Sequence, residues 1–218
     1  MIMAGEVITG GKQNRIIGKD LILLPHSGKI DISVYCVEAQ RWETVSTGTN
    51  QFAGYYSVGS LSLRKAVDKD SGQARIWANV DKLNTANNTY AGNTTKTYTA
   101  LTQSTDFTKN LKEYTDFFKN KLGGQKDIIG VVVVTGNKVV GCDMFATNAL
   151  FKQNIENLLA SYSTEAILNG APVTASASTV KAYMDKLLSN EHQQAATIKE
   201  KGKAFTNGGK KMRVSSYE

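Results

Sequence analysis

The chain has 218 residues, of which 41% are hydrophobic and 21% are charged, a globular composition that excludes disordered and fibrous proteins. Most of the net charge of +7 lies in residues 198–213, which hold six basic residues against Glu200 alone. The longest apolar run, Ile128–Val134, is far shorter than the roughly 20 residues of a membrane-spanning helix. The N-terminus lacks a basic stretch followed by a long apolar one, so we expect no signal peptide and a cytoplasmic location.

Neither a metal site nor a cofactor site is expected. Cys36 and Cys142 lie in separate apolar runs, which is typical of buried reduced thiols, and no CxxC or Cys/His spacing occurs. The two histidines, His26 and His192, are far apart in the sequence. No dinucleotide-binding GxGxxG before a helix, no GxxxxGK[ST] and no GxSxG occurs. The easily recognised enzyme classes are therefore excluded, and whether the chain is an enzyme stays open.

The first half of the chain begins with short β-prone runs separated by glycines and turn residues. These runs are Glu6–Ile8, Arg15–Ile17, Leu21–Leu24, Lys29–Glu38 and Trp42–Ser46. Helices are predicted at Tyr56–Val67 and, from apolar residues at helical spacing, at Gln73–Leu83. Residues 84–104 are rich in Asn and Thr and predict a surface loop that leaves room for one strand at Thr95–Leu101.

The second half predicts helices around one hairpin. Ser104 can cap a helix that ends near Leu122. Strands at Ile128–Thr135 and Lys138–Met144 flank Gly136-Asn137, and the run of valines predicts a strand buried on both faces. Helices follow over residues 147–168 and from Ser176 or Ser178 to Leu188, and Met212–Tyr217 can form an edge strand.

This order of elements predicts an α+β fold rather than a doubly wound sheet. We expect a mainly antiparallel N-terminal sheet, a central β-hairpin and helices packed on the sheet. The prediction is a single domain over residues 1–218, with a β-rich part at 1–50, helices with the hairpin at 55–190 and a basic tail at 198–218.

The densest group of functional side chains lies in the β-rich part, within residues 12–15 and 36–42. We predict a ligand site formed by Asn14, Arg15, Glu38, Arg41 and Trp42. An arginine beside a carboxylate and an indole can bind a phosphate, stack on a base or close a salt bridge. The alternative is structural: Glu38 and Arg41 form an ion pair at a sheet edge and Trp42 belongs to the core.

Four further residues are ambiguous from the sequence. Gln73 lies one helical turn before Trp77, so the two share a face, and Gln73 can buttress a site or remain solvated. Asp143 ends a predicted buried strand, where capping the next helix is favoured over a catalytic role. For Tyr162 and Glu165, packing and solvation are favoured in the same way.

These motifs resemble a bacterial family in order and spacing. The opening motifs Lys12-Gln13-Asn14-Arg15, Leu24-Pro25 and Val34 to Trp42 are similar to those of the ADP-ribosylglycohydrolase and rhodanese-phosphatase associated proteins. The resemblance continues through four further pieces of the chain: Ser60 with Leu63-Arg64, Gln73 with Trp77, Gly141-Cys142-Asp143-Met144-Phe145, and the helix that carries Ser161-Tyr162 and Glu165-Ala166. It implies a role in NAD or ADP-ribose metabolism, in which the chain binds or processes a nucleotide derivative.

Three functions are carried forward. The first is binding or processing of a nucleotide-derived small molecule by the five predicted residues. The second is a noncatalytic structural or interaction module in which the same residues serve as scaffolding. The third is nucleic-acid binding through the basic tail, which ranks last because the rest of the chain is close to neutral. No membrane partner is expected, and the oligomeric state is not predicted.

Overall fold

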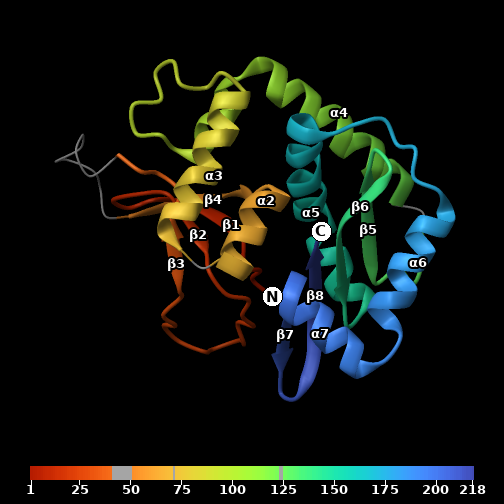
Figure 1. Cartoon of the computed structure of the whole chain (residues 1–218). Coiled ribbons are helices and arrows are strands. Elements are labelled where there is room, and N and C mark those ends of the chain that lie inside the picture. Colours follow the sequence, from red (N-terminus) through yellow and green to blue (C-terminus); the bar gives the residue numbers. More distant parts are fainter. Residues whose placement is uncertain (41–50, 71, 123–124) are drawn as a thin grey trace. The chain divides into compact units, whose positions relative to one another are not determined.

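The computed structural model describes residues 1–40, 51–70, 72–122 and 125–218. It has the predicted α+β class: within these residues, helices accompany two four-stranded antiparallel sheets (Figure 1). The chain divides into two compact units. Unit 1 consists of Met1–Phe118 and Asn157–Leu168, and unit 2 of Lys119–Glu156 and Asn169–Glu218. None of the described helices is long and apolar enough to cross a membrane.

The sheet of unit 1 has the strand order β3-β2-β1-β4. Its strands are β1 (Glu6–Gly10), β2 (Arg15–Ile17), β3 (Val34–Cys36) and β4 (Phe52–Val58). Val7 of β1 pairs with Ile16 of β2, and both side chains are fully buried, so one face of this sheet lies on the core.

The strand predictions for this region were partly confirmed. The strand predicted at Glu6–Ile8 extends to Gly10, and the one at Arg15–Ile17 is confirmed. Leu21–Leu24 is wrong, because only Leu21 forms a single bridge, and the long run at Lys29–Glu38 shortens to β3. The predicted strand Trp42–Ser46 lies outside the described residues.

The helices of unit 1 begin with α2 (Leu61–Lys65), which continues into a π-helix at Ala66–Asp70, and α3 (Gln73–Ala86). The helix predicted at Tyr56–Val67 therefore starts too early, since Tyr56–Val58 belongs to β4. Ser60 begins α2, because its side chain accepts a hydrogen bond from Leu63 N. The prediction of α3 is confirmed.

Two further elements follow α3. The strand predicted at Thr95–Leu101 is wrong: Tyr98–Gln103 is a 3₁₀ helix, capped by the side chain of Thr97, which accepts from Thr99 N. The helix predicted from Ser104 is confirmed as α4 (Thr105–Leu122), and Ser104 Oγ accepts from Phe107 N at 3.2 Å. Phe107 is buried in this helix, whereas Tyr114 and Phe118 are exposed.

The sheet of unit 2 has the strand order β5-β6-β8-β7. Its strands are β5 (Gly130–Thr135), β6 (Lys138–Phe145), β7 (Gly202–Asn207) and β8 (Lys210–Tyr217). The predicted hairpin is confirmed as β5–β6, with Gly136 in the left-handed region at φ 55°. The valines of β5 are only half-buried, contrary to the prediction, because β5 is an edge strand.

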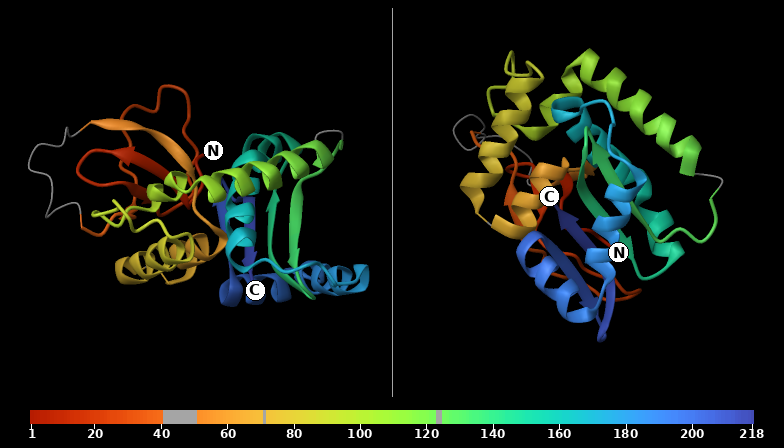
Figure 2. Two further views of the ribbon diagram at one scale, coloured as in Figure 1. Left: turned by 90° about the horizontal axis from the view of Figure 1, so that it is seen from above. Right: turned by 45° about the vertical axis from the view of Figure 1, so that its right-hand side comes forward.

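The remaining helices are α5 (Asn148–Asn169), α6 (Ala177–Leu188) and α7 (Glu191–Lys201). The predictions of α5 and α6 are confirmed, and Ser176 caps α6 by accepting from Thr179 N. Helix α7 lies against β7 and β8, and α6 against β6 (Figure 2). The basic C-terminal segment is thus folded, and its last strand is an inner strand rather than the predicted edge strand.

Candidate functional site

Two of the five predicted site residues lie together in unit 1. Asn14 and Glu38 are 7% and 3% exposed. Asn14 directly precedes β2 and Glu38 lies just after β3, at the same end of these two paired strands. Arg15 is half-buried on β2, opposite Cys36. Arg41 and Trp42 lie outside the described residues, so the convergence of all five around one ligand stays a prediction.

Asn14 is tied to the chain around it through both its backbone and its side chain. Its N–H donates to Glu38 Oε2 at 2.9 Å, and its side-chain amide donates to the hydroxyls of Thr97 at 2.9 Å and Thr99 at 3.2 Å. The amide oxygen accepts from Gly10 N at 3.3 Å. These bonds satisfy buried polar groups, which is the role of a scaffold residue.

Two glutamines fasten the neighbouring strand β3. The side-chain amide of Gln73 accepts from Cys36 N at 2.9 Å and donates to Cys36 O at 2.7 Å. Gln13 donates to Glu38 O at 2.9 Å, and its oxygen accepts from the Cys36 thiol at 2.8 Å. Burial raises the pKa of the Cys36 thiol, the Arg15 guanidinium lowers it, and Glu38 raises it further. This residue is therefore held mainly as a protonated thiol.

We call Gln13, Asn14, Cys36, Glu38 and Gln73 the strand-end cluster. Its members bond mainly to the backbone and side chains of unit 1, and Gln73 occupies the outer edge of β3 as a further strand would. Of the two interpretations left open by the sequence, this geometry favours scaffolding for Asn14 and Glu38. Gln73 is not merely solvated, since its amide bonds to the backbone of Cys36, and a role in supporting a ligand site stays a prediction.

A second polar cluster of unit 1 joins α2 to the second half of α5. Glu165 accepts from Ser62 N at 2.9 Å and from Ser62 Oγ at 2.7 Å, so both carboxylate oxygens hold the first turn of α2. Two residues further along α2, the guanidinium of Arg64 lies 5.7 Å from the centre of the Tyr162 ring. We call Ser62, Arg64, Tyr162 and Glu165 the arginine cluster.

Burial differs across the arginine cluster. Arg64 and Tyr162 are 1% and 6% exposed, whereas Ser62 and Glu165 are half-buried and reach the surface. Ser161, one helical turn before Glu165, is fully buried, and its hydroxyl has no hydrogen-bond partner among the described residues. The cluster therefore combines a buried cation on an aromatic ring with an accessible, anchored carboxylate.

The surroundings fix the arginine cluster in place. Gly5 has φ +92°, and a Cβ there would lie 2.7 Å from Arg64 Cγ, so only glycine leaves room for the arginine stem. Ser60 N donates to Tyr98 Oη at 3.1 Å. Burial strongly raises the pKa of Tyr98, which keeps this phenol protonated. The π-helix directly after α2 is of a kind often found at functional sites.

The sequence favoured a helix-capping role for Asp143 in unit 2, and this prediction is wrong. It lies on β6 directly opposite Ser215 on β8, and its Oδ1 accepts from the Ser215 hydroxyl. The same oxygen lies 3.4 Å from Arg213 Nε. We call these three residues the sheet-face cluster, and each is at most 2% exposed.

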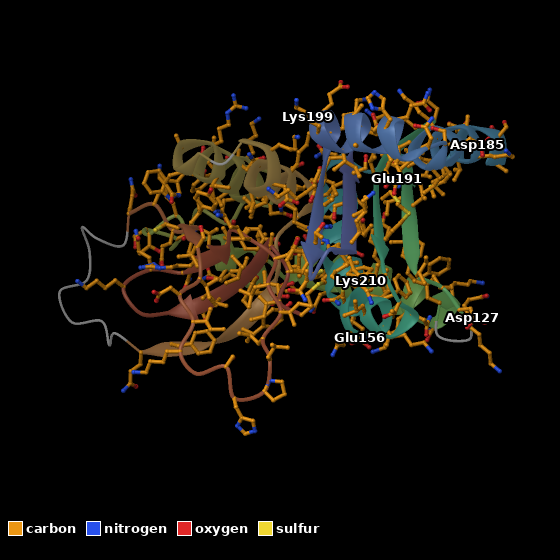
Figure 3. All side chains as sticks on the ribbon, turned by 90° about the horizontal axis from the view of Figure 1, so that it is seen from below. Asp127, Glu156, Asp185, Glu191, Lys199 and Lys210 are labelled. Carbon is orange, nitrogen blue, oxygen red and sulfur yellow. The ribbon has the colours of Figure 1, made fainter. Side chains whose placement is uncertain are left out.

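The basic segment carries less surface charge than its sequence suggests. Arg213 is buried, and Lys201 pairs with Glu218 at 2.6 Å. Figure 3 shows acidic and basic side chains together along α6 and α7, with Asp185, Glu191 and Lys199 labelled. Nucleic-acid binding by this segment stays a prediction. Its test is substitution of the exposed lysines, because deletion of residues 199–218 would remove the strands β7 and β8.

The family comparison covers nearly the whole chain. A model of the ARG and Rhodanese-Phosphatase-superfamily-associated Protein domain matches residues 1–216. The chain belongs to this family. No curated protein and no solved structure matches it. The motifs that carried the resemblance contribute to all three clusters. They supply Gln13 and Cys36 to the strand-end cluster, Arg64 and Glu165 to the arginine cluster, and Asp143 to the sheet-face cluster.

Sequence reasoning missed the arginine cluster as a group. Arg64 was noted only within a motif, and Tyr162 and Glu165 were assigned to packing and solvation. One signal was available: an arginine among apolar residues of a short helix, in Leu61-Ser62-Leu63-Arg64, is out of place unless it has a partner. The identity of that partner depended on a helix far along the chain.

Proposed function

We propose that this chain binds a nucleotide derivative of the ADP-ribose kind through the arginine cluster of unit 1. The observation that carries the proposal is the buried guanidinium of Arg64 over the ring of Tyr162. Membership of a family named for its association with ADP-ribosylglycohydrolases and rhodanese-phosphatases supports the choice of ligand.

The chemistry of the cluster fits the parts of such a ligand. A guanidinium presents a planar set of N–H donors that matches phosphate oxygens, and it can stack on an aromatic ring at the same time. Glu165 is held by the backbone and hydroxyl of Ser62, so its orientation is fixed before any ligand arrives. A fixed carboxylate is a suitable acceptor for ribose hydroxyls.

The decisive experiment is calorimetric titration of ADP-ribose into the full chain, with AMP and ribose 5-phosphate as its parts. Arg64→Lys keeps the charge but loses the planar donor set, and we expect at least about tenfold weaker binding, the effect of one lost charge-assisted hydrogen bond. Tyr162→Leu should weaken binding, whereas Tyr162→Phe keeps the ring. Arg75→Lys, on the exposed face of α3, is the matched control.

Thermal unfolding of each variant separates loss of binding from loss of fold. The proposal fails if ADP-ribose does not bind the native chain, or if folded Arg64→Lys binds it as tightly as the native chain does. Incubation of the chain with ADP-ribose, followed by chromatography of the nucleotide, then tests whether bound ADP-ribose is converted to a product.

A second candidate, a noncatalytic interaction module, is favoured by the strand-end cluster. Asn14 and Glu38 were two of the five expected ligand residues. Their described hydrogen bonds go to each other, to Gly10, to Gln13 and to the threonines at the start of the 3₁₀ helix. This function predicts that no nucleotide binds the native chain and that Asn14→Ala lowers the melting temperature.

A further inference from the structure

The contact between Ser62 and Glu165 in unit 1 places a hydroxyl group against a carboxylate. Ser62 Oγ donates to Glu165 Oε1 at 2.7 Å, within the roughly 2.6–3.2 Å over which a proton can pass to a general base. The other carboxylate oxygen, Oε2, accepts from Ser62 N at 2.9 Å. One residue thus holds both oxygens of the carboxylate, and this fixes the orientation of Glu165.

Support of helix α2 accounts for only part of this contact. Ser62 N is one of the N–H groups that the first turn of a helix leaves without an intrahelical partner, and Glu165 satisfies it. That N–H needs one acceptor oxygen, and an uncharged amide would supply it. Both residues are half-buried, so the carboxylate can also meet a small molecule or water at the surface of the fold. The charge and the accessibility of Glu165 therefore leave room for a second role.

The place of this contact within the arginine cluster indicates which part of a nucleotide it would face. Tyr162 and Glu165 are three residues apart and therefore share a face of α5. Arg64 contacts the first of them and Ser62 the second. With the guanidinium on the phosphates of a nucleotide, the carboxylate is left for a ribose. A carboxylate that holds a ribose hydroxyl stabilises the positive charge that develops on the sugar when its glycosidic bond breaks.

We propose that Glu165 is the catalytic base for cleavage of a glycosidic bond, with Ser62 as its positioning residue. The substrate is a nucleotide whose ribose carries a pyridinium base, as in NAD, and the inference rests on the proposed binding of an ADP-ribose group. The bond between the anomeric carbon and the pyridinium nitrogen breaks with its electron pair going to the nitrogen, so nicotinamide leaves uncharged and needs no proton. Water adds its oxygen to the anomeric carbon and gives a proton to Glu165, which releases it to solvent. The products are ADP-ribose and nicotinamide.

The test follows the release of nicotinamide from NAD by the full chain, measured by chromatography. Glu165→Gln keeps an acceptor oxygen for Ser62 N but cannot take up a proton, so it should still bind ADP-ribose and lose kcat about 100-fold or more. Ser62→Ala should lower kcat about tenfold with little change in KM, and Ser62→Thr should restore most of kcat. Ser57→Ala is the matched control, because Ser57 is also half-buried in unit 1 but donates to the carbonyl of Val58 at 3.4 Å.

Failure of this inference and failure of the proposed function give different results. If ADP-ribose binds the native chain but no nicotinamide is released, the catalytic role is overturned and the binding function stands. Release at the native rate by folded Glu165→Gln overturns the catalytic role as well. If ADP-ribose does not bind, the proposed function fails. Nicotinamide release that Glu165→Gln abolishes would then still support the base, and the absence of release would overturn it.

Thermal unfolding reports the fold of each variant. If Glu165→Gln does not fold, the comparison of Ser62→Ala with Ser62→Thr gives the answer. A merely structural hydroxyl group would leave kcat of folded Ser62→Ala at the native value, and that result overturns the positioning role.

Discussion

At the scale of single residues, Gln73 shows how one amide can replace a strand. The outer edge of β3 presents the N–H and C=O of Cys36, and the Gln73 side chain bonds to both. An open strand edge would otherwise offer these groups to another chain. The half-buried thiol of Cys36 is held in the same small network by Gln13.

Removal of this amide should destabilise the chain. In Gln73→Ala, the backbone N–H and C=O of Cys36 lose their partners, and we expect the free energy of unfolding to fall by about 1–3 kcal/mol. Urea unfolding of the native chain and the variant measures this free energy. Asn79→Ala is the control, since the Asn79 side chain also donates to a backbone carbonyl of the same helix, that of Arg75, but through a solvent-exposed hydrogen bond. Equal losses in the two variants would refute the role given to Gln73.

The residue scale also shows what the sequence could and could not predict. Asn14 and Glu38 do lie together, because residues at the ends of paired strands meet. Their partners Thr97 and Thr99 were not predicted, because they come from the start of a 3₁₀ helix in a segment predicted as a loop or a strand. The ligand role of all five residues stays a prediction: Asn14, Arg15, Glu38, Arg41 and Trp42.

At the scale of elements, the position of α2 depends on the turn before β1. Gly5 N donates to Ile17 O at 2.8 Å, and Gly59 N donates to Gly5 O at 2.8 Å, so this glycine links the sheet to the entry of α2. Its positive φ and its contact with the Arg64 stem leave no space for a side chain.

Gly5→Ala should therefore displace Arg64 and disturb the arginine cluster. We expect a lower melting temperature and weaker binding of ADP-ribose, since strain at the positive φ adds to the clash. Gly92→Ala provides the control, because Gly92 also has a positive φ, +78°, but an added Cβ there meets nothing within 4 Å. If both substitutions weaken binding equally, backbone strain alone is responsible and the contact with Arg64 is irrelevant.

Elements were predictable where their periodicity was strong. Helices α3 to α6 and the β5–β6 hairpin follow from apolar spacing and turn residues. Helix α7 was missed because Ile198 is its buried residue and no apolar stripe marks it. The strand at Met212–Tyr217 was predicted, but its inner place in the sheet was not, because its neighbour β7 was not predicted.

At the scale of the whole molecule, several buried acidic groups are kept neutral. Burial, with a further contribution from Asp143, raises the pKa of Cys142 from 9.0 to about 12. Burial also raises the pKa of Tyr98 and Tyr183 well above their usual value. In the unfolded chain, these groups ionise near their ordinary pKa values.

Stability should consequently fall in alkaline solution. A raised folded pKa stabilises the fold below the unfolded pKa, and this contribution is lost as the pH rises from about 9 towards about 12. Between about pH 8 and about pH 10.5, we expect the native chain to lose about 2 kcal/mol more than Cys142→Ala does. Urea unfolding at both pH values measures this, with Cys36→Ala as the half-buried control. A loss of equal size in the native chain and in Cys142→Ala would contradict the assignment.

The fold class was predictable at this scale, whereas the division of the chain was not. A β-rich segment followed by helices, one hairpin and further helices indicates α+β from the order of the elements alone. Nothing in the periodicity of α5 reveals that its residues up to Glu156 belong to unit 2 and those from Asn157 to Leu168 belong to unit 1. That division depends on contacts between distant segments.

This division has a consequence for synthesis on the ribosome. Unit 1 lacks Tyr162 and Glu165 until the chain has already produced the β5–β6 hairpin, and β7 has no neighbour in its sheet until β8 emerges. Neither unit can finish folding from its early residues alone, although domains generally fold in the order of their synthesis. Nascent chains of this protein should thus expose unpaired strands late into translation.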